Sequence, residues 1–256
     1  MLLTIDIGNT NLTVGLYDNE ELAFLARLAT DKNRTAEQYA VELSQIAILK
    51  GYPLNEIDGS IISSVVPDLT AVIKKAVSIL TGISAKVVGP GLKSGLNIKI
   101  DNPAQLGADL VAGAVAAVNK YELPCLVMDL GTATKISVID ANGVYRGCTI
   151  SAGVGISLNA LASSAAQLPS VNLDLEYCPS YGTNTVTSMQ AGIILGTAAM
   201  LDGLSDKIEE SLGETVKTIV ATGGLASDIA KHCRRKLICE PNLVLDGLRI
   251  IFNKNL

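Results

Sequence analysis

The chain has 256 residues, of which 48% are hydrophobic and 18% are charged, and its formal net charge is −5. This length suffices for one large domain or two small ones, and the composition excludes an intrinsically disordered chain. The acidic balance gives nucleic-acid binding little support, because the largest basic cluster is the trio Arg234–Lys236, which we interpret as a solvated helix end.

The sequence also limits the cellular compartment in which the protein can work and the catalytic chemistry available to it. No apolar run reaches the roughly 18 residues of a membrane span, so we expect no membrane association, and the first residues lack the basic region of a signal peptide. The five cysteines form no Cys-x-x-Cys pair, so we expect neither a disulfide framework nor a zinc site, and a reducing cytoplasm fits best. His232 is the only histidine, which leaves almost no material for a His-based triad.

The first predicted element is a β-hairpin over residues 2–17, in which a Gly/Asn turn joins two apolar strands. Asp6 stands at the end of the first strand, where its carboxylate can leave the sheet. Gly8 has no Cβ and lets a ligand approach the backbone, and residues 9–11 add short polar donors. Such a turn suits phosphate oxygens. The alternative is an ordinary N-terminal hairpin, because Asn and Gly are common turn formers.

Strands and helices alternate after this hairpin. Apolar periodicity and capping signals predict a strand over 21–28, a helix from Thr35 to about Lys50, a strand over 58–65, a helix from Pro67 to about Leu80 and a short strand over 86–88. Together with the first hairpin, the order is βββαβαβ. This order is typical of a mixed sheet with crossover helices.

A single helix is predicted over 102–118, because Asn102 suits an N-cap and Pro103 suits the first helical position. Asp109 falls in its second turn and is the only charged residue of the segment. An unpaired charge in an apolar setting is costly, so we interpret Asp109 as a candidate general base. The alternative is a buried aspartate paired with an arginine or a backbone N–H elsewhere.

Residues 125–139 repeat the pattern of the first hairpin: an apolar strand, then Asp129, Gly131 and hydroxyl side chains, then a second strand. The two copies stand about half the chain apart. They indicate a duplicated domain with two phosphate-binding loops that face each other across a cleft.

The second half continues with a strand over 145–150, a small-residue helix over 152–167 and a long helix from residue 182 to about 210. Thr185 near the start of the long helix offers a hydroxyl and an N–H to an anionic ligand, or is a plain helix cap. Residues 218–224 predict a strand that ends in a Gly-Gly loop suited to a nucleotide. The low charge of residues 142–200 indicates burial against another subunit.

Taken together, these loops resemble those of the actin-like ATPase and sugar kinase superfamily, and the chain resembles the type III pantothenate kinases from end to end. The matching segments, in family order, are Asp6–Thr10, Ser64–Pro67, Asp101–Pro103, Gly107–Asp109, Asp129–Thr134, Gly182–Thr185 and Thr222–Gly224. The resemblance implies an α/β fold of duplicated actin-like (ribonuclease H-like) domains, each a mixed five-stranded sheet flanked by helices, with the ATP cleft between them. We place the first domain at residues 1–119 and the second at 120–256.

The resemblance implies an enzyme that transfers phosphate from ATP to the hydroxyl of pantothenate, giving 4'-phosphopantothenate in the first step of coenzyme A biosynthesis. Asp109 would be the general base. The residues implied around the ATP phosphates are Asp6, Ile7, Gly8, Asn9, Thr10, Asn11, Leu12, Thr13 and Thr132. Asp6 would also hold the divalent cation, Mg²⁺, that accompanies ATP, and Asp129 would hold a monovalent cation, K⁺ or NH₄⁺. The residues implied around pantothenate are Gly107, Ala108, Asp109, Leu110 and Thr185. Family members are homodimers.

Four residues depart from the family pattern. Leu110 stands in place of the usual arginine that contacts the acceptor, and Ile100 stands in place of an aromatic residue. Lys135 replaces the second threonine of the second phosphate loop, and Ala152 replaces a proline. These departures leave open a kinase for another small hydroxyl acceptor, or a non-catalytic nucleotide-binding regulator. The retained Asp109 speaks against a regulator, which has no need of a base.

Overall fold

The computed structural model describes residues 1–52, 56–173 and 178–256. These residues divide into two units, each built on one mixed sheet. The first unit comprises Met1–Leu96, Asp101–Ala116 and Leu243–Leu256, and the second comprises Asn97–Ile100 and Ala117–Asn242. The C-terminal segment after Asn242 therefore packs with the first unit, although the sequence-based boundary of 120–256 places it in the second domain.

The first unit contains a five-stranded sheet in the order β3-β2-β1-β4-β5. Its strands are β1 (Leu2–Ile7), β2 (Asn11–Asp18), β3 (Glu21–Ala29), β4 (Gly59–Ser64) and β5 (Lys86–Val87). The first three strands are antiparallel, and β1, β4 and β5 are parallel. This arrangement confirms the predicted βββαβαβ order, since parallel strands need a crossover such as a helix between them.

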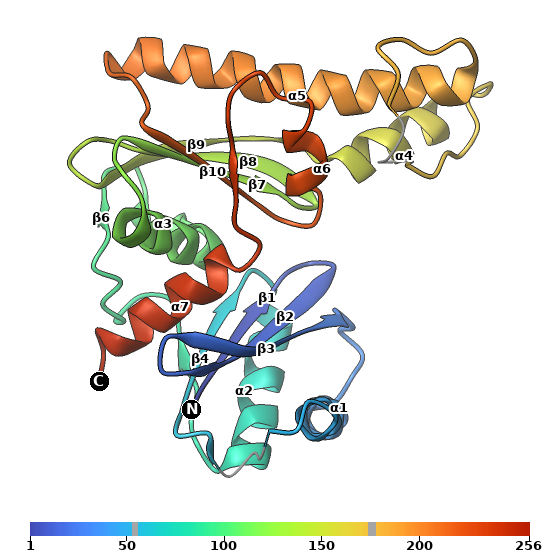
Figure 1. Cartoon of the computed structure of the whole chain (residues 1–256). Helices are drawn as coiled ribbons and strands as arrows, with labels where there is room; N and C mark the ends of the chain where they lie inside the picture. The colour runs from blue at the N-terminus through green and yellow to red at the C-terminus, as the bar shows by residue number, and fades with distance from the viewer. Residues whose placement is uncertain (53–55, 174–177) are drawn as a thin grey trace. The chain divides into compact units, whose positions relative to one another are not determined.

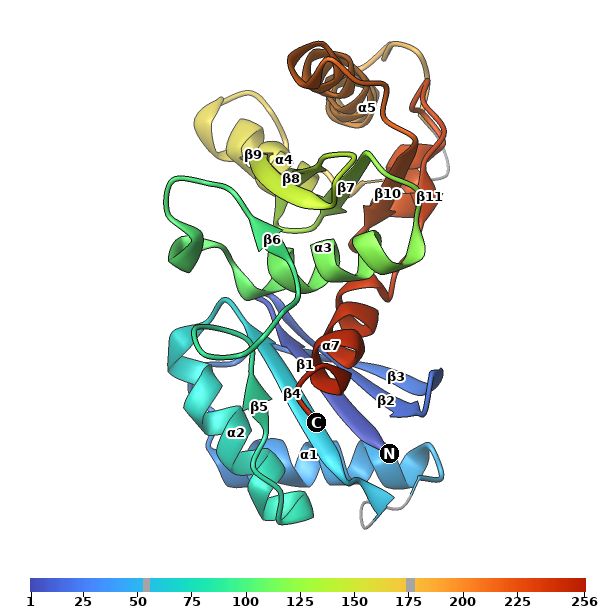
Figure 2. The same ribbon diagram turned by 90° about the vertical axis from the view of Figure 1, so that its left-hand side faces the viewer.

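Helices cover both faces of this first sheet. On one face, α1 (Ala36–Leu49) and α2 (Pro67–Thr81) pack against the alternate apolar residues of the strands, among them Ile5 and Ile7. On the other face lies α7 (Leu243–Asn253), which contacts β1, β2 and β4 (Figure 2). The predicted starts are confirmed, because Thr35 forms a capping box with Gln38 and Pro67 opens α2.

The second unit contains a six-stranded sheet in the order β11-β10-β7-β8-β9-β6. Its strands are β6 (Asn97–Ile98), β7 (Cys125–Leu130), β8 (Ala133–Ile139), β9 (Val144–Ala152), β10 (Thr218–Thr222) and β11 (Ile238–Cys239). The sheet has one strand more than the five expected. The two short edge strands β6 and β11 form by pairing with distant residues, and neither carries an alternating apolar pattern that could reveal it in the sequence.

Three helices cover one face of this second sheet (Figure 1). They are α4 (Val154–Ser164), α5 (Thr185–Leu212) and α6 (Ala226–Ala230). Their apolar side chains form one core with alternate residues of β7, among them Leu126, Met128 and Leu130. Asp129 lies between two of these core residues, so its side chain points to the opposite face of the sheet.

The helix predicted over 102–118 is interrupted. A 3₁₀ turn occupies Pro103–Gln105, Leu106 has an extended backbone, and α3 begins only at Ala108 and ends at Lys120. Asn102 makes no side-chain cap bond. Asp109 therefore lies in the first turn of the helix and not in the second, and the expectation of one continuous helix was wrong.

Within the described ranges, no helix combines the length and the apolar character needed to cross a membrane. The five cysteines are all free thiols. Burial raises the pKa of the Cys125 thiol to about 12 and that of Cys233 to about 11. A thiol reacts as its thiolate, so the thiols of Cys125 and Cys233 are unreactive at neutral pH.

Candidate active site

The first predicted phosphate loop is the turn between β1 and β2. The N–H of Gly8 donates to the carbonyl of Asn11 at 3.0 Å and closes the turn. Ile7 and Leu12 are fully buried register partners, so only their backbone groups can face a ligand. The side chains of residues 9–11 are exposed. This part of the site is therefore a small turn that presents polar side chains to solvent.

Thr30 supports this turn from the end of β3, and sequence reasoning missed it. Its hydroxyl donates to the carbonyl of Gly8 at 2.7 Å, and the Thr30 N–H donates to the carbonyl of Thr10 at 3.0 Å. The two bonds tie both ends of the turn to the third strand. No local pattern could have revealed this role, because Thr30 lies some twenty residues further along the chain than the turn.

Asp6 points to the face of the first sheet that is opposite the α1–α2 core, since Ile5 and Ile7 on either side of it belong to that core. Its register partner on the parallel strand β4 is Ser63, whose buried hydroxyl has no hydrogen-bond partner among the described residues. Carboxylate and hydroxyl oxygens are suitable for Mg²⁺, which often takes one or two carboxylates and completes its shell with substrate phosphates and water. The residues around Asp6 therefore fit a divalent cation that enters with ATP.

The structure describes no cluster of three or more His, Cys, Asp or Glu side chains that could hold a metal ion by themselves.

Asp109 is held in a defined place at the start of α3. Its Oδ1 accepts a hydrogen bond from the N–H of Leu110 at 2.8 Å. Gly107 packs directly beside it, since a Cβ built on Gly107 would stand 2.5 Å from that Oδ1. The same Cβ would lie 3.8 Å from Cγ1 of Val65, whose N–H donates to the carbonyl of Ile7 at 3.0 Å. Asp109 and the first phosphate loop thus lie within one unit, with Gly107 beside the carboxyl ends of β1 and β4.

The second predicted phosphate loop is the turn between β7 and β8 in the second unit. The N–H of Gly131 donates to the carbonyl of Ala133 at 3.2 Å, and Thr132 at the tip is exposed. Gly153, the residue before α4, donates its N–H to the carbonyl of Thr132 at 3.2 Å. A Cβ on Gly153 would stand 2.3 Å from that oxygen, so only glycine fits. Gly153 therefore holds the loop, which the sequence did not reveal.

Asp129 precedes this loop and forms an ion pair with Lys135. Lys135 Nζ lies 2.9 Å from Asp129 Oδ2, and both side chains are mostly buried. The two residues are direct partners in the antiparallel register of β7 and β8. The residue that departs from the family pattern therefore contacts the residue that was expected to bind a monovalent cation.

The predicted Gly-Gly loop follows β10 and lies beside the second phosphate loop. Gly223 has φ +96°, and its backbone packs closely against the backbone of Leu130 at the end of β7. The second unit thus brings together Asp129, the turn at Thr132 and the Gly-Gly loop at the carboxyl ends of strands β7 and β10.

Thr185 is the first residue of α5 and does not cap it. The cap is Asn184, whose side chain accepts from the N–H of Thr187 at 3.0 Å in a capping box. The interpretation of Thr185 as a plain helix cap was therefore wrong. Its exposed side chain lines a surface pocket of the second unit together with Leu161, Leu168, Ser188, Met189, Gly192 and Ile193.

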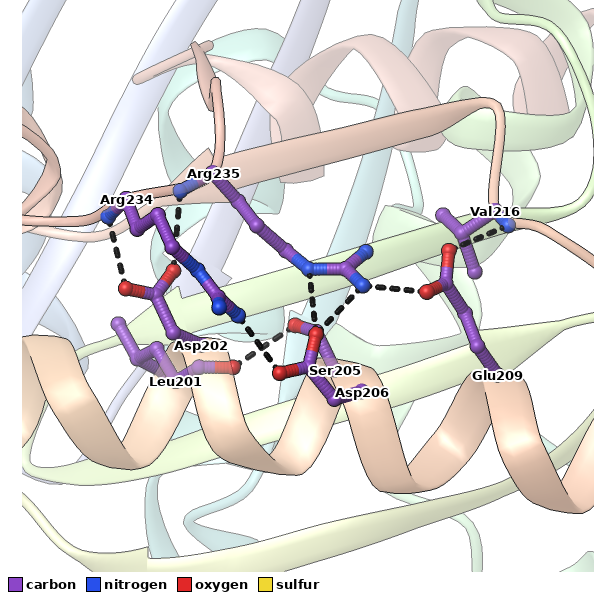
Figure 3. A network of polar contacts seen from close by, with 8 residues as sticks. All are labelled: Leu201, Asp202, Ser205, Asp206, Glu209, Val216, Arg234 and Arg235. Carbon is purple, nitrogen blue, oxygen red and sulfur yellow. Dashed lines mark hydrogen bonds and ion pairs between the residues drawn. The ribbon is translucent and has the colours of Figure 1, made fainter.

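Two residues of the basic trio, Arg234 and Arg235, contact acidic residues of α5 (Figure 3). Arg235 donates to Asp206 at 2.6 Å and also pairs with Glu209, and Arg234 donates to Asp206 at 2.6 Å. Arg234 first, and then Arg235, hold the pKa of the Asp206 carboxyl below its usual value. Arg235 lowers the pKa of Glu209 in the same way. Arg234 and Arg235 therefore join this segment to α5. Our interpretation of the trio as solvated agrees with the exposed Arg234 and Lys236 but not with the mostly buried Arg235.

Solved structures share this fold over nearly the whole chain. A Baf family protein from Campylobacter jejuni, described as a transcriptional activator, matches with a TM-score of 0.63 and 18% identity, covering 99% of this chain and 98% of that chain. An inorganic polyphosphate/ATP-glucomannokinase from an Arthrobacter strain matches with a TM-score of 0.51 and 15% identity, covering 100% and 99%. At this level of identity the likeness shows the fold alone, an α/β fold of two mixed sheets flanked by helices.

Sequence comparison narrows this class to one family. The family model for the type III pantothenate kinases matches residues 2–207. A type III pantothenate kinase from Exiguobacterium sibiricum is 41% identical over 257 residues, with 100% of each chain covered. The chain therefore belongs to the type III pantothenate kinase family.

Proposed function

We propose that this protein catalyses the ATP-dependent phosphorylation of pantothenate to 4'-phosphopantothenate, the first step of coenzyme A biosynthesis. The observation that carries the proposal is the placement of Asp109, which Gly107 and the Leu110 N–H fix at the start of α3. The same unit carries the first phosphate loop. A kinase for an alcohol needs such a positioned carboxylate beside the phosphates, whereas a nucleotide sensor does not.

In the proposed mechanism, Asp109 takes the proton of the primary hydroxyl of pantothenate. The hydroxyl oxygen attacks the γ-phosphorus of ATP in line, the bond from that phosphorus to the β–γ bridging oxygen breaks, and ADP leaves. Asp6 would hold a divalent cation, which would supply positive charge to the phosphate oxygens. The short polar side chains of residues 9–11 and of Thr132 bind the phosphates, and the exposed turns described above suit this role.

The acceptor pocket is proposed to include Gly107, Ala108, Asp109, Leu110 and Thr185. Leu110 cannot bind the carboxylate of pantothenate as the usual arginine does, because it has no polar side-chain group. The exposed pocket around Thr185 supports an acceptor contact there. We further propose a cytoplasmic homodimer with no nucleic-acid or membrane partner. The apolar side chains of Ile156 and Leu161 that α4 leaves exposed support the subunit contact.

The resemblance also implies a monovalent cation at Asp129, and the residues present do not fit one. The ammonium group of Lys135 stands 2.9 Å from the Asp129 carboxylate, which is the contact that such a cation would make. We therefore assign no step of the reaction to K⁺ or NH₄⁺.

The test is to incubate the purified protein with MgATP and pantothenate and to identify the products by mass spectrometry. We expect ADP and pantothenate carrying one added phosphate. A panel of other small hydroxyl acids, assayed in parallel, addresses the second candidate function that Leu110 and Ile100 suggest. Phosphate transfer to another acceptor alone would replace pantothenate as the substrate. ATP binding without transfer to any acceptor would favour a regulatory protein.

A further inference from the structure

Lys135 and Asp129 form a cross-strand pair whose geometry is fixed by the sheet. The two residues face each other in the register of β7 and β8, next to the turn that holds Thr132. In such a pair the side chains leave the same face of the sheet, so a lysine at this position reaches its partner without any change of backbone. The Nζ–Oδ2 distance is 2.9 Å, and the exposed fractions are 18% for the Lys135 side chain and 25% for that of Asp129.

The burial of the neighbouring residues favours a stable ion pair between the Lys135 ammonium group and the Asp129 carboxylate. The neighbours of Lys135 along β8, Thr134 and Ile136, are buried on the other face. On the far side of Asp129, the register partner in β10 is Thr222, a buried neutral residue. A mostly buried carboxylate requires a counter-charge, and removal of one partner of such a pair leaves an uncompensated charge.

This counter-charge matters because the loop is proposed to bind phosphates. A bare carboxylate at the base of the loop would repel the polyphosphate chain of ATP, whereas a paired one would not. A tethered ammonium group is present at a high effective concentration at every moment, so a dissolved cation gains little by competing with it.

We propose that the ammonium group of Lys135 is the resident counter-cation of Asp129, so that nucleotide binding and phosphoryl transfer proceed without a bound K⁺ or NH₄⁺. The inference rests on the proposed function only for its activity assay. Lys135 acts through Asp129 and is a positioning residue, not a catalytic one.

The first experiment uses the unaltered protein in chloride salts of K⁺, NH₄⁺ or tetramethylammonium at equal ionic strength. Two quantities are measured, the rate of pantothenate phosphorylation and the dissociation constant of MgATP by calorimetry. We expect the rate and the dissociation constant each to agree within about twofold among the three salts, because at equal ionic strength the salts screen charges to a similar extent. Stimulation of either quantity by about tenfold or more in K⁺ or NH₄⁺ would overturn the inference.

The second experiment uses Lys135→Thr, with Lys135→Arg as the charge-preserving variant and Lys207→Thr as the control from an exposed ion pair of α5. Lys135→Thr is expected to bind MgATP about tenfold more weakly in tetramethylammonium and to regain affinity in K⁺ or NH₄⁺, because Asp129 then lacks the Lys135 ammonium group and recruits the dissolved cation. Lys135→Arg and Lys207→Thr are expected to remain insensitive to the salt. A Lys135→Thr protein that is folded by circular dichroism and equally insensitive would contradict the inference.

The calorimetric measurement separates this inference from the proposed function. If no salt supports pantothenate phosphorylation, the proposed function fails, and the MgATP affinity of the unaltered protein in the three salts still decides the role of Lys135. That measurement needs no variant, so misfolding of Lys135→Thr does not remove the test.

Discussion

Gly107 leaves no room for a Cβ beside Asp109: a Cβ at that position would lie 2.5 Å from Oδ1 of the aspartate. The same oxygen accepts the N–H of Leu110 at 2.8 Å. The Leu110 N–H thus holds the carboxylate on one side, and the backbone at Gly107 lies close to it on the other side. A base that is held in this way loses little freedom when the acceptor binds.

A methyl group at position 107 is therefore expected to displace the base. Gly107→Ala should lower kcat by about 100-fold, because a shift of about 1 Å at a reacting group has an effect of this size. The MgATP dissociation constant should change little, since the substitution does not touch the phosphate loops. Gly203→Ala is the matched control, because a Cβ there meets no atom within 4 Å. Equal kcat values for the two variants would show that the position of the Asp109 carboxylate is not critical.

Gly153→Ala should damage the second phosphate loop. The added Cβ would stand 2.3 Å from the carbonyl oxygen of Thr132, and overpacking of this kind costs about 1–3 kcal/mol. We expect weaker MgATP binding by about tenfold and a lower melting temperature, measured by calorimetry and differential scanning fluorimetry. Gly155→Ala, two residues further along α4, places its Cβ in open space and should match the unaltered protein in both measurements. A Gly153→Ala protein with normal affinity would remove this loop from the ATP site.

Much of the fold and part of the site follow from short patterns. Thr35 and Pro67 start their helices as predicted, because a cap bond and a proline at the first helical position are local features. The alternation of apolar residues in β1 places Ile5 and Ile7 in the core and leaves Asp6 on the other face. Both Asp-bearing hairpins are therefore visible in the sequence alone.

The parts that escaped prediction depend on contacts between distant residues. The signal at Asn102–Pro103 is genuine, since a 3₁₀ turn begins there, but the extended backbone at Leu106 interrupts the helix. The pairing of Asn97–Ile98 with β9 has no local signature, because two residues cannot show a period. Lys135 is visible in the sequence only as a departure from the family, and its partner becomes known from the strand register.

The ion pairs of Arg235 predict how stability responds to acid. Since Arg234 and Arg235 lower the pKa of Asp206, and Arg235 lowers that of Glu209, these carboxylates bind protons more weakly in the folded than in the unfolded protein. Their stabilising contribution is therefore complete above the ordinary carboxyl pKa of about 4 and is lost as the pH falls through the lowered values. Arg235→Ala should lower Tm by about 2–4 °C at neutral pH.

The difference in Tm between the unaltered protein and Arg235→Ala should narrow as the pH falls below about 4, where both carboxylates become protonated. Thermal unfolding by circular dichroism over this pH range measures it. Lys207→Ala removes an exposed ion pair with Glu210 on the same helix and should change Tm very little at any pH. A Tm difference for Arg235→Ala that stays constant through the acid range would show that the effect is loss of packing and not of charge.

The role of Asp109 is tested most directly by comparing Asp109→Asn with the unaltered protein in two assays, phosphate transfer from MgATP to pantothenate and MgATP binding by calorimetry. The substitution keeps the shape of the side chain and removes its ability to take a proton. We expect transfer to fall by at least about 100-fold, while the dissociation constant of MgATP stays within about twofold of that of the unaltered protein. Unchanged transfer, or the loss of transfer and ATP binding together, would contradict the assignment of Asp109 as the general base of a pantothenate kinase.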